Sequence, residues 1–538
     1  MSGRLDLAIT GGTVIDGTGA ARRAADVGVA GDRIAAVAEP GELGPAAETV
    51  NARGQVVCPG FIDIMSHSLW PLFIDGRSLS KLLQGVTTEV MGEGYSPAPH
   101  GGLVGAPEPW IDGVPSRWLE QIPGWRRFGD WLRALERAGV SPNVASFVGG
   151  GTVRAYACGM RTGPATRSQL DTMCEVAGDA MRDGAMGVAY ALIYPPDAYA
   201  STGEIAAVAR VVAAAGGMYA SHIRSESDRL LEAVDEALAI ARRSGVRTEI
   251  YHLKASGGRR NWHLMAPAIE RIEAARGEGL PVTADMYPYA ASGTGLSARL
   301  PVSLAADGRL FARLAEPGTR DWVRAELARG TPEVDDAGPP ETTMPIGLRR
   351  PEHRGYVGRN LAEIAAMRGG DWVDCVFDLL IAEGREVFTI YHEMCEQNVR
   401  EQLRLDWIAV CSDGGGLDPA WAAAQGPVHP RDYGTFARVL GHYARDEAVL
   451  GLEDAVRKMS GAVAARLGIA DRGRLAPGMH ADVVVFDPAR VRDRATFADP
   501  HRLAEGVRDV WVNGVATVRG GEHTGALAGR FVRGPGAR

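Results

Sequence analysis

One stretch of the sequence, residues 217–254, restricts the fold more than any other. It reads GMYASHIRSESDRLLEAVDEALAIARRSGVRTEIYHLK. Two short apolar runs, each closed by a histidine, flank a segment with apolar residues at helical spacing. This pattern predicts a strand, a helix and a second strand, with His222 and His252 at the strand ends. We expect the charged side chains of the middle segment, Glu226 among them, to stay in water.

The same alternation recurs along the chain and predicts an α/β protein. Eight strand-like runs occur, at residues 61–67, 86–93, 143–150, 185–191, 217–223, 248–253, 282–289 and 407–413. Eight parallel strands that alternate with helices are typical of a (β/α)8 TIM barrel. A long loop follows the second run. We predict an inserted subdomain at about 290–404, between strands seven and eight, because this segment has helical patterns of its own, as at 371–384.

Both ends of the chain carry short runs of alternating apolar and polar residues, which is the pattern of antiparallel strands. These runs lie at residues 4–57, 473–488 and 508–522. We predict that residues 1–58 and 471–538 form one small composite β-sandwich domain, with the barrel of residues 59–470 inserted between them. Two unrelated β extensions are the alternative.

Composition and charge argue against several classes of function. The net charge is −8, and the sequence contains no basic stretch of the kind that binds a phosphate backbone. We therefore expect no nucleic-acid partner. The start of the chain lacks a signal-peptide pattern, and no run of about 18 apolar residues occurs. We therefore expect a cytoplasmic protein without a membrane partner. The six cysteines show no paired spacing, which argues against a zinc ribbon or a disulfide framework. The oligomeric state stays open.

Polar side chains stand at the ends of the predicted strands, where a parallel barrel has its active site. They are His67, Glu93, His222, His252, Tyr287, Tyr289 and Asp413. Two histidines and a carboxylate suit Zn²⁺ in an open site, and a further carboxylate can act as a base on water that the ion activates. A single polar residue at a strand end has a structural role about as often as a functional one. Their joint placement favours a metal site.

A series of motifs in this order resembles one family over nearly the whole chain. The motifs are DLAITGGTVIDGTG, PGFID, GVTTEV, ALIYPPDAYAS, SHIRSES, YHLKASG, DMYPY, CSDGG, HPRDYGTFARVLGHY and DRGRLAPGMHADVVVFDP. They resemble the amidohydrolase superfamily and, within it, the D-aminoacylase branch of N-acyl-D-amino-acid deacylases. The resemblance implies the barrel with a composite β-sandwich and the hydrolysis of N-acyl-D-amino acids, or related D-configured amides and dipeptides, by metal-activated water. It also implies metal-ligand roles for His222 and His252 and proton shuttling by Asp413.

Three positions depart from the family pattern. The family has His-x-His after the first strand, but this chain reads Met65-Ser66-His67, and methionine is a poor zinc ligand. Glu93 stands where the branch has a cysteine ligand, and a carboxylate can bind the same ion. Glycines at 149–151 replace a histidine after the third strand. We therefore predict one tightly bound Zn²⁺, held by Glu93, His222 and His252. Whether a second metal binds stays open.

The other site residues have predicted roles in catalysis or substrate binding. We expect Asp413 to take a proton from water and return it to the leaving amine. His67 is expected to contact the water or the oxyanion, or to serve as a further metal ligand, and Tyr287 or Tyr289 is a second donor to that oxygen. The residues predicted to bind substrate are Arg431, through a bidentate contact with a carboxylate, Tyr289 and Lys254.

Two other functions are considered for this sequence. One is a cyclic amidohydrolase of the hydantoinase or dihydropyrimidinase type, which would use similar metal ligands on a ring amide. The other is a non-catalytic binding protein on an amidohydrolase scaffold. This alternative is considered because Met65 stands where the family has a histidine ligand. The sequence leaves the acyl group and the preferred amino-acid side chain undetermined.

Overall fold

Parallel strands occur in all eight runs where the sequence predicts them. The computed structural model describes residues 4–330 and 338–538. One parallel sheet has the order β6 (Phe61–Asp63), β7 (Val86–Met91) and β8 (Asn143–Ser146). A second parallel sheet contains, in order, β9 (Val148–Gly149), β10 (Gly187–Ala191), β11 (Met218–His222), β12 (Arg247–Ile250), β13 (Val282–Met286) and β17 (Ile408–Val410).

The two parallel sheets are connected at both edges. β8 and β9 belong to one predicted run and are separated only by Phe147, whose N–H donates to the carbonyl of Met91 at 2.8 Å. At the opposite edges, Ser66 and Gly414 form a parallel bridge, and the N–H of Asp413 donates to the carbonyl of Met65 at 3.0 Å. The strands therefore follow one another in chain order.

The helices between these strands form where apolar residues recur at helical spacing. α8 (Leu230–Ser244) buries Leu230, Val234, Leu238 and Ile240, and the next residue, Gly245, closes the helix with a positive φ of 72°. The other α-helices outside the insert are α1 (Leu69–Ile74), α2 (Leu79–Leu82), α3 (Ser116–Gln121), α4 (Gly129–Ala138), α5 (Gly150–Cys158), α6 (Arg167–Arg182), α7 (Thr202–Ala214), α9 (Met265–Gly277), α15 (Pro419–Ala422), α16 (Arg431–Arg438), α17 (Leu452–Met459) and α18 (Gly461–Leu467).

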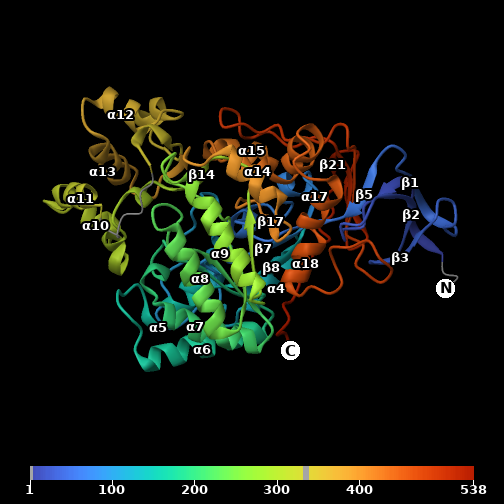
Figure 1. The fold of residues 1–538 in the computed structure, drawn as a ribbon, viewed down its shortest axis with the longest axis horizontal. Helices are drawn as coiled ribbons and strands as arrows, with labels where there is room; N and C mark the ends of the chain where they lie inside the picture. Colours follow the sequence, from blue (N-terminus) through green and yellow to red (C-terminus); the bar gives the residue numbers. More distant parts are fainter. Residues whose placement is uncertain (1–3, 331–337) are drawn as a thin grey trace.

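The segment between β13 and β17 has its own sheet and its own apolar core. Its strands are β14 (Ser292–Gly295), β15 (Thr343–Pro345) and β16 (Phe388–Tyr391). The helix α14 (Glu396–Arg404) leads back to β17, and the four helices before it are α10 (Leu310–Leu314), α11 (Thr319–Arg329), α12 (Leu361–Arg368) and α13 (Trp372–Glu383). The helix predicted at 371–384 is confirmed as α13, which Asp371 caps by accepting from the N–H of Asp374. Figure 1 shows these four helices together at one end of the molecule, opposite β1, β2 and β3.

The two ends of the chain contribute to one mixed sheet, in which the structure describes nine strands. The joint is the antiparallel pair of β5 and β18, in which Cys58 lies opposite Val484. The strands are β1 (Leu5–Val14), β2 (Arg23–Ala30), β3 (Arg33–Ala38), β4 (Ala46–Asn51), β5 (Val56–Pro59), β18 (Val483–Phe486), β19 (Val507–Val512), β20 (Val515–Arg519) and β21 (Glu522–His523). Within the described ranges, no helix is long and apolar enough to cross a membrane.

Candidate metal centre

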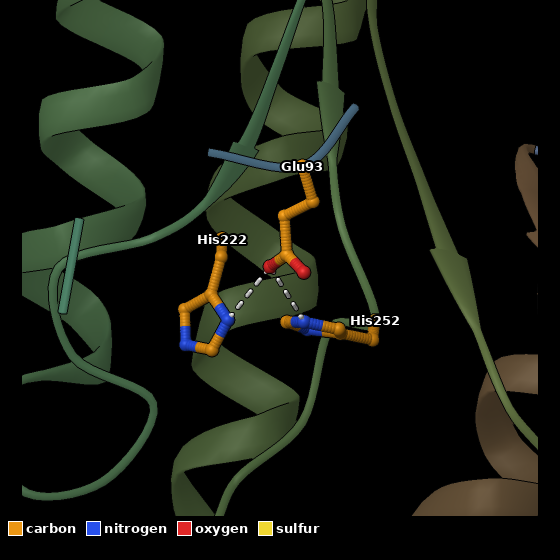
Figure 2. A group of neighbouring side chains, drawn as sticks. All are labelled: Glu93, His222 and His252. Carbon is orange, nitrogen blue, oxygen red and sulfur yellow. Dashed lines mark hydrogen bonds and ion pairs between the residues drawn. The ribbon is translucent and has the colours of Figure 1, made fainter. Parts of the chain in front are cut away.

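Three side chains from the carboxyl ends of β7, β11 and β12 point toward one another (Figure 2). Glu93 Oε1 lies 3.1 Å from His222 Nδ1 and 3.6 Å from His252 Nε2. All three donor atoms lie within 4.8 Å of one another. Ligands of a tetrahedral zinc ion, each about 2.0–2.1 Å from the metal, lie roughly 3.3 Å apart. The donor types and their spacing therefore fit zinc.

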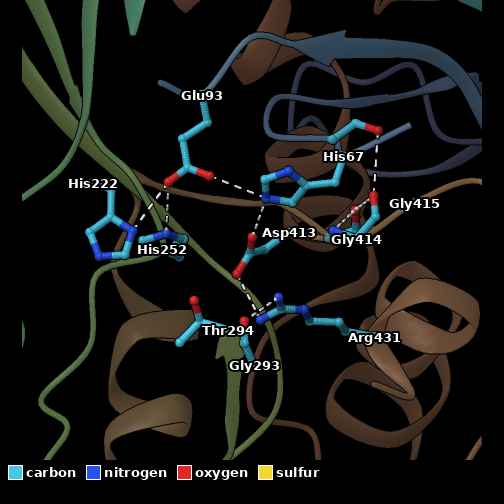
Figure 3. A network of polar contacts seen from close by, with 12 residues as sticks. His67, Glu93, His222, His252, Gly293, Thr294, Asp413, Gly414, Gly415 and Arg431 are labelled. Atoms are coloured by element: carbon cyan, nitrogen blue, oxygen red, sulfur yellow. Dashed lines mark hydrogen bonds and ion pairs between the residues drawn. The ribbon is translucent and has the colours of Figure 1, made fainter. Parts of the chain in front are cut away.

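Glu93 also belongs to a second group of donors (Figure 3). His67 Nε2 lies 3.2 Å from Glu93 Oε2 and 2.9 Å from Asp413 Oδ1. The other oxygen of Asp413 lies 2.7 Å from Arg431 Nη1. The structure thus brings together all four predicted ligands and the predicted base, but it pairs that base with a guanidinium.

Nearby charges keep the carboxylates of this network ionised. Burial alone would raise the pKa of Asp413, but the positive charges of Arg431, His252 and His67 lower it. The pKa of Glu93 is lowered in the same way, because its contacts with the three histidines outweigh its burial. Burial would lower the pKa of His67, but its hydrogen bonds to Asp413 and Glu93 raise that pKa to about 10. At neutral pH both carboxylates are therefore ionised and can bind a cation.

Two residues of the site have left-handed backbone conformations. The φ angles are 32° for His252 and 49° for Asp413. Such conformations cost roughly 1–3 kcal/mol each when the residue is not glycine. The N–H of His252 donates to the buried carboxylate of Asp285 at 2.6 Å, and the N–H of Asp413 donates to the carbonyl of Met65. These bonds hold the two side chains in the directions that the site requires.

Three of the predicted catalytic and substrate-binding residues also meet at this centre. Arg431 Cζ lies 4.9 Å and Lys254 Nζ lies 5.6 Å from the centre of the Tyr287 ring, distances typical of cation–π contacts. Arg431 Nη2 also donates to the carbonyl of Gly293 in β14, at 3.1 Å (Figure 3). The insert therefore contributes backbone to the surroundings of Asp413.

Tyr289 makes different contacts from Tyr287. Its hydroxyl donates to the carbonyl of Pro430 at 3.4 Å, and its ring packs edge-on against His429 and Phe497. β13 ends at Met286, three residues before the predicted end of this strand at Tyr289. The predicted contact of Tyr289 with substrate stays a prediction.

The expectation that Glu226 stays in water is wrong. Its side chain is 9% exposed, and it lies in the loop between β11 and α8, before the helix begins. Its carboxylate contacts His222, His252 and Lys254, with Lys254 Nζ 2.6 Å from Oε1. Burial would raise the pKa of Glu226, but the positive charges of His222, Lys254 and His252 lower it to about 2. Its spacing of four residues from His222 was the signal that we missed.

Comparisons with known proteins agree with this geometry. Residues 328–518 match the model of a family described as "Amidohydrolase family". The chain is 38% identical to the D-aminoacylase of Alcaligenes xylosoxydans xylosoxydans over 530 residues, which are 98% of this chain and 97% of that protein. It superposes with a TM-score of 0.80 on the N-acyl-D-glutamate deacylase of Bordetella bronchiseptica, crystallised with zinc and a phosphonate inhibitor. That match is 33% identical and covers 99% of this chain and 100% of that structure.

A more distant structural likeness concerns the hydantoinases. The L-hydantoinase of Arthrobacter aurescens superposes with a TM-score of 0.56 at 16% identity, over 98% of this chain and 100% of that one. At this level of identity the likeness shows the fold alone. It gives no support to a ring-opening activity over the cleavage of an acyclic amide.

Proposed function

We propose that this chain, which belongs to the D-aminoacylase branch of the amidohydrolase family, is a zinc-dependent hydrolase that cleaves the amide bond of N-acyl-D-amino acids or related D-configured dipeptides. The observation that carries the proposal is the convergence of Glu93, His222 and His252 on one point. It occurs in a chain that is similar to D-aminoacylase over 98% of its length.

In this proposal Glu93, His222 and His252 hold one zinc ion. When bound, zinc supplies a Lewis acid that polarises the amide carbonyl and lowers the pKa of water toward about 7. The second group of donors binds a cation more weakly for two reasons. The guanidinium of Arg431 already pairs with Asp413, and Met65 supplies no imidazole.

Asp413 acts as the general base and then as the general acid. It is ionised at neutral pH, so it accepts the proton of the attacking water and returns it to the amine, which leaves poorly unless it is protonated. His67 lies between the two carboxylates, where its Nε2–H orients Asp413 and stabilises charge on the reacting oxygen. Tyr287 is a further donor candidate for that oxygen.

Arg431 and Lys254, which both contact the Tyr287 ring, bind the carboxylate of the substrate. A guanidinium has five N–H donors, and the contacts of Arg431 with Asp413 and Gly293 leave others for a carboxylate. Tyr289 is proposed as a weaker contributor to the same pocket.

The fold that supports this function is proposed to be a (β/α)8 barrel at residues 59–470 with a composite β-sandwich from residues 1–58 and 471–538. The parallel bridge between Ser66 and Gly414 supports closure of the barrel, and the pairing of β5 with β18 supports a domain built from both ends. The subdomain at about 290–404 borders the site through Gly293.

A release-of-amine screen with Zn²⁺ present tests the function. It compares N-acyl-D-amino acids, their L enantiomers, D-dipeptides and hydantoins at equal concentration. We expect turnover of N-acyl-D-amino acids well above that of the other classes. Preferred turnover of hydantoins or of L enantiomers would contradict the proposal.

A further inference from the structure

Glu226 contacts the two central histidines on the side of each ring that faces away from Glu93. Glu226 Oε2 lies 3.4 Å from His222 Nε2, and Oε1 lies 2.9 Å from His252 Nδ1. Glu93 faces the other nitrogen of each ring, His222 Nδ1 and His252 Nε2. His222 therefore presents Nδ1 to Glu93 and Nε2 to Glu226, whereas His252 presents Nε2 to Glu93 and Nδ1 to Glu226. Their rings are nearly perpendicular, at 86°.

This geometry bears on which nitrogen of each imidazole carries the proton. A neutral imidazole binds a metal through its unprotonated nitrogen and donates its N–H to a neighbouring acceptor, and that acceptor selects the tautomer. Glu226 Oε2 and Oε1 are the carboxylate oxygens nearest to His222 Nε2 and His252 Nδ1, and a carboxylate in this position favours a proton on the nitrogen that faces it. We propose that Glu226 is a positioning residue that selects the Nε2–H tautomer of His222 and the Nδ1–H tautomer of His252, so that both free lone pairs face the zinc site.

The backbone of Glu226 is placed for this role. Its carbonyl accepts from the N–H of Ser256 at 2.7 Å and from the Ser256 hydroxyl at 3.0 Å. Ser256 follows His252 by four residues, as Glu226 follows His222. The loop that carries Glu226 is thus bonded to the segment that follows the other histidine, and one carboxylate reaches both rings.

Lys254 defines the competing arrangement. Its Nζ lies 2.8 Å from His252 Nδ1 and 2.6 Å from Glu226 Oε1. If the ammonium donated to Nδ1, the proton of His252 would stand on Nε2, toward Glu93, and that nitrogen could not bind a cation. In that arrangement Glu226 would serve only as the counter-ion of Lys254. The two arrangements predict different tautomers and different effects of substitution.

The inference rests on the proposed zinc site, so the first measurement uses the wild-type protein. Ring-¹⁵N-labelled histidine is incorporated, and the zinc-free protein, in which no ion fixes the tautomer, is studied by long-range ¹H–¹⁵N correlation, with His222→Gln and His252→Gln for assignment. We expect a protonated Nε2 in His222 and a protonated Nδ1 in His252. A protonated Nδ1 in His222, or a protonated Nε2 in His252, overturns the inference.

The second measurement is zinc affinity, determined by competition of the apo-protein with a chromophoric chelator. We expect Glu226→Gln to weaken zinc binding by about 10–100-fold, whereas the control Glu236→Gln changes it by less than about twofold. Glu236 is a suitable control because it pairs with Arg224 on the same strand–helix unit. We expect the double variant Glu226→Gln/Lys254→Met to stay as weak as Glu226→Gln.

The outcomes separate this inference from the proposed function. If the wild type binds no zinc, the metal site of the proposed function is overturned, and the role of Glu226 with it. If the wild type binds zinc and Glu226→Gln binds it equally well, only the role of Glu226 is overturned. Recovery of wild-type affinity in the double variant also overturns it, because Glu226 would then serve only Lys254. If Glu226→Gln fails to fold, the wild-type tautomers decide alone.

Discussion

Glu93 presents one oxygen to His222 and His252 and the other to His67, and the two sides of this carboxylate are built differently. On the first side the carboxylate of Glu226, which is itself paired with Lys254, lies behind both imidazoles. On the second side Asp413 is backed by the cationic Arg431 at 2.7 Å. An anion behind the ligands favours a bound cation, whereas a cation behind the carboxylate disfavours one.

The difference separates two tasks that use chemically similar groups. The side with His222 and His252 is suited to hold a metal ion, and the side with His67 and Asp413 is suited to move a proton near it. Substitutions on the two sides should therefore have different signatures in metal content and in turnover.

The largest effect is expected from Glu93→Ala. Because Glu93 Oε1 is the carboxylate donor of the first group, the variant should lose zinc and activity together while the fold is retained, since the apolar clusters do not depend on this residue. Elemental analysis and circular dichroism measure the two quantities. Full zinc occupancy in this variant would show that Glu93 is not a ligand.

The next effect is expected from Asp413→Asn. The amide keeps the shape of the carboxylate but does not accept a proton, so kcat should fall by about 10²–10⁴-fold or more. Zinc content should stay close to that of the wild type, because the first group is intact. Normal turnover in this variant would place the base elsewhere, with Tyr287 and His67 as the next residues to test.

A smaller effect is expected on the second group of donors. The wild type should retain one zinc per chain after dialysis, because Arg431 repels a second ion. In Arg431→Met this positive charge is absent, and binding of a second zinc should tighten by about tenfold, or about 1.4 kcal/mol.

Calorimetric zinc titration measures this change, and Arg438→Met serves as the control because Arg438 pairs with Asp493. A second ion bound tightly by the wild type would contradict the comparison between the two sides of Glu93.

Much of this protein was predictable from local patterns in its sequence. The eight strand runs, α13 and α8 were found because burial of one face imposes a period on the apolar residues. His222, His252, Glu93 and Asp413 were found because parallel strands bring their carboxyl ends to one edge, so a polar residue after each strand is a candidate. Both of these arguments need only residues that are close together in the chain.

Contacts between distant loops were decided only by the tertiary structure. The segment SESD looks like the solvated start of a helix, but the helix begins at Leu230, and the preceding loop turns Glu226 inward, where Ser256 holds it. Arg431 lies in a different element from Asp413, and nothing in their spacing indicates that they form an ion pair. No periodicity encodes such contacts, because each depends on the path of two loops and on the charge that the buried site must balance.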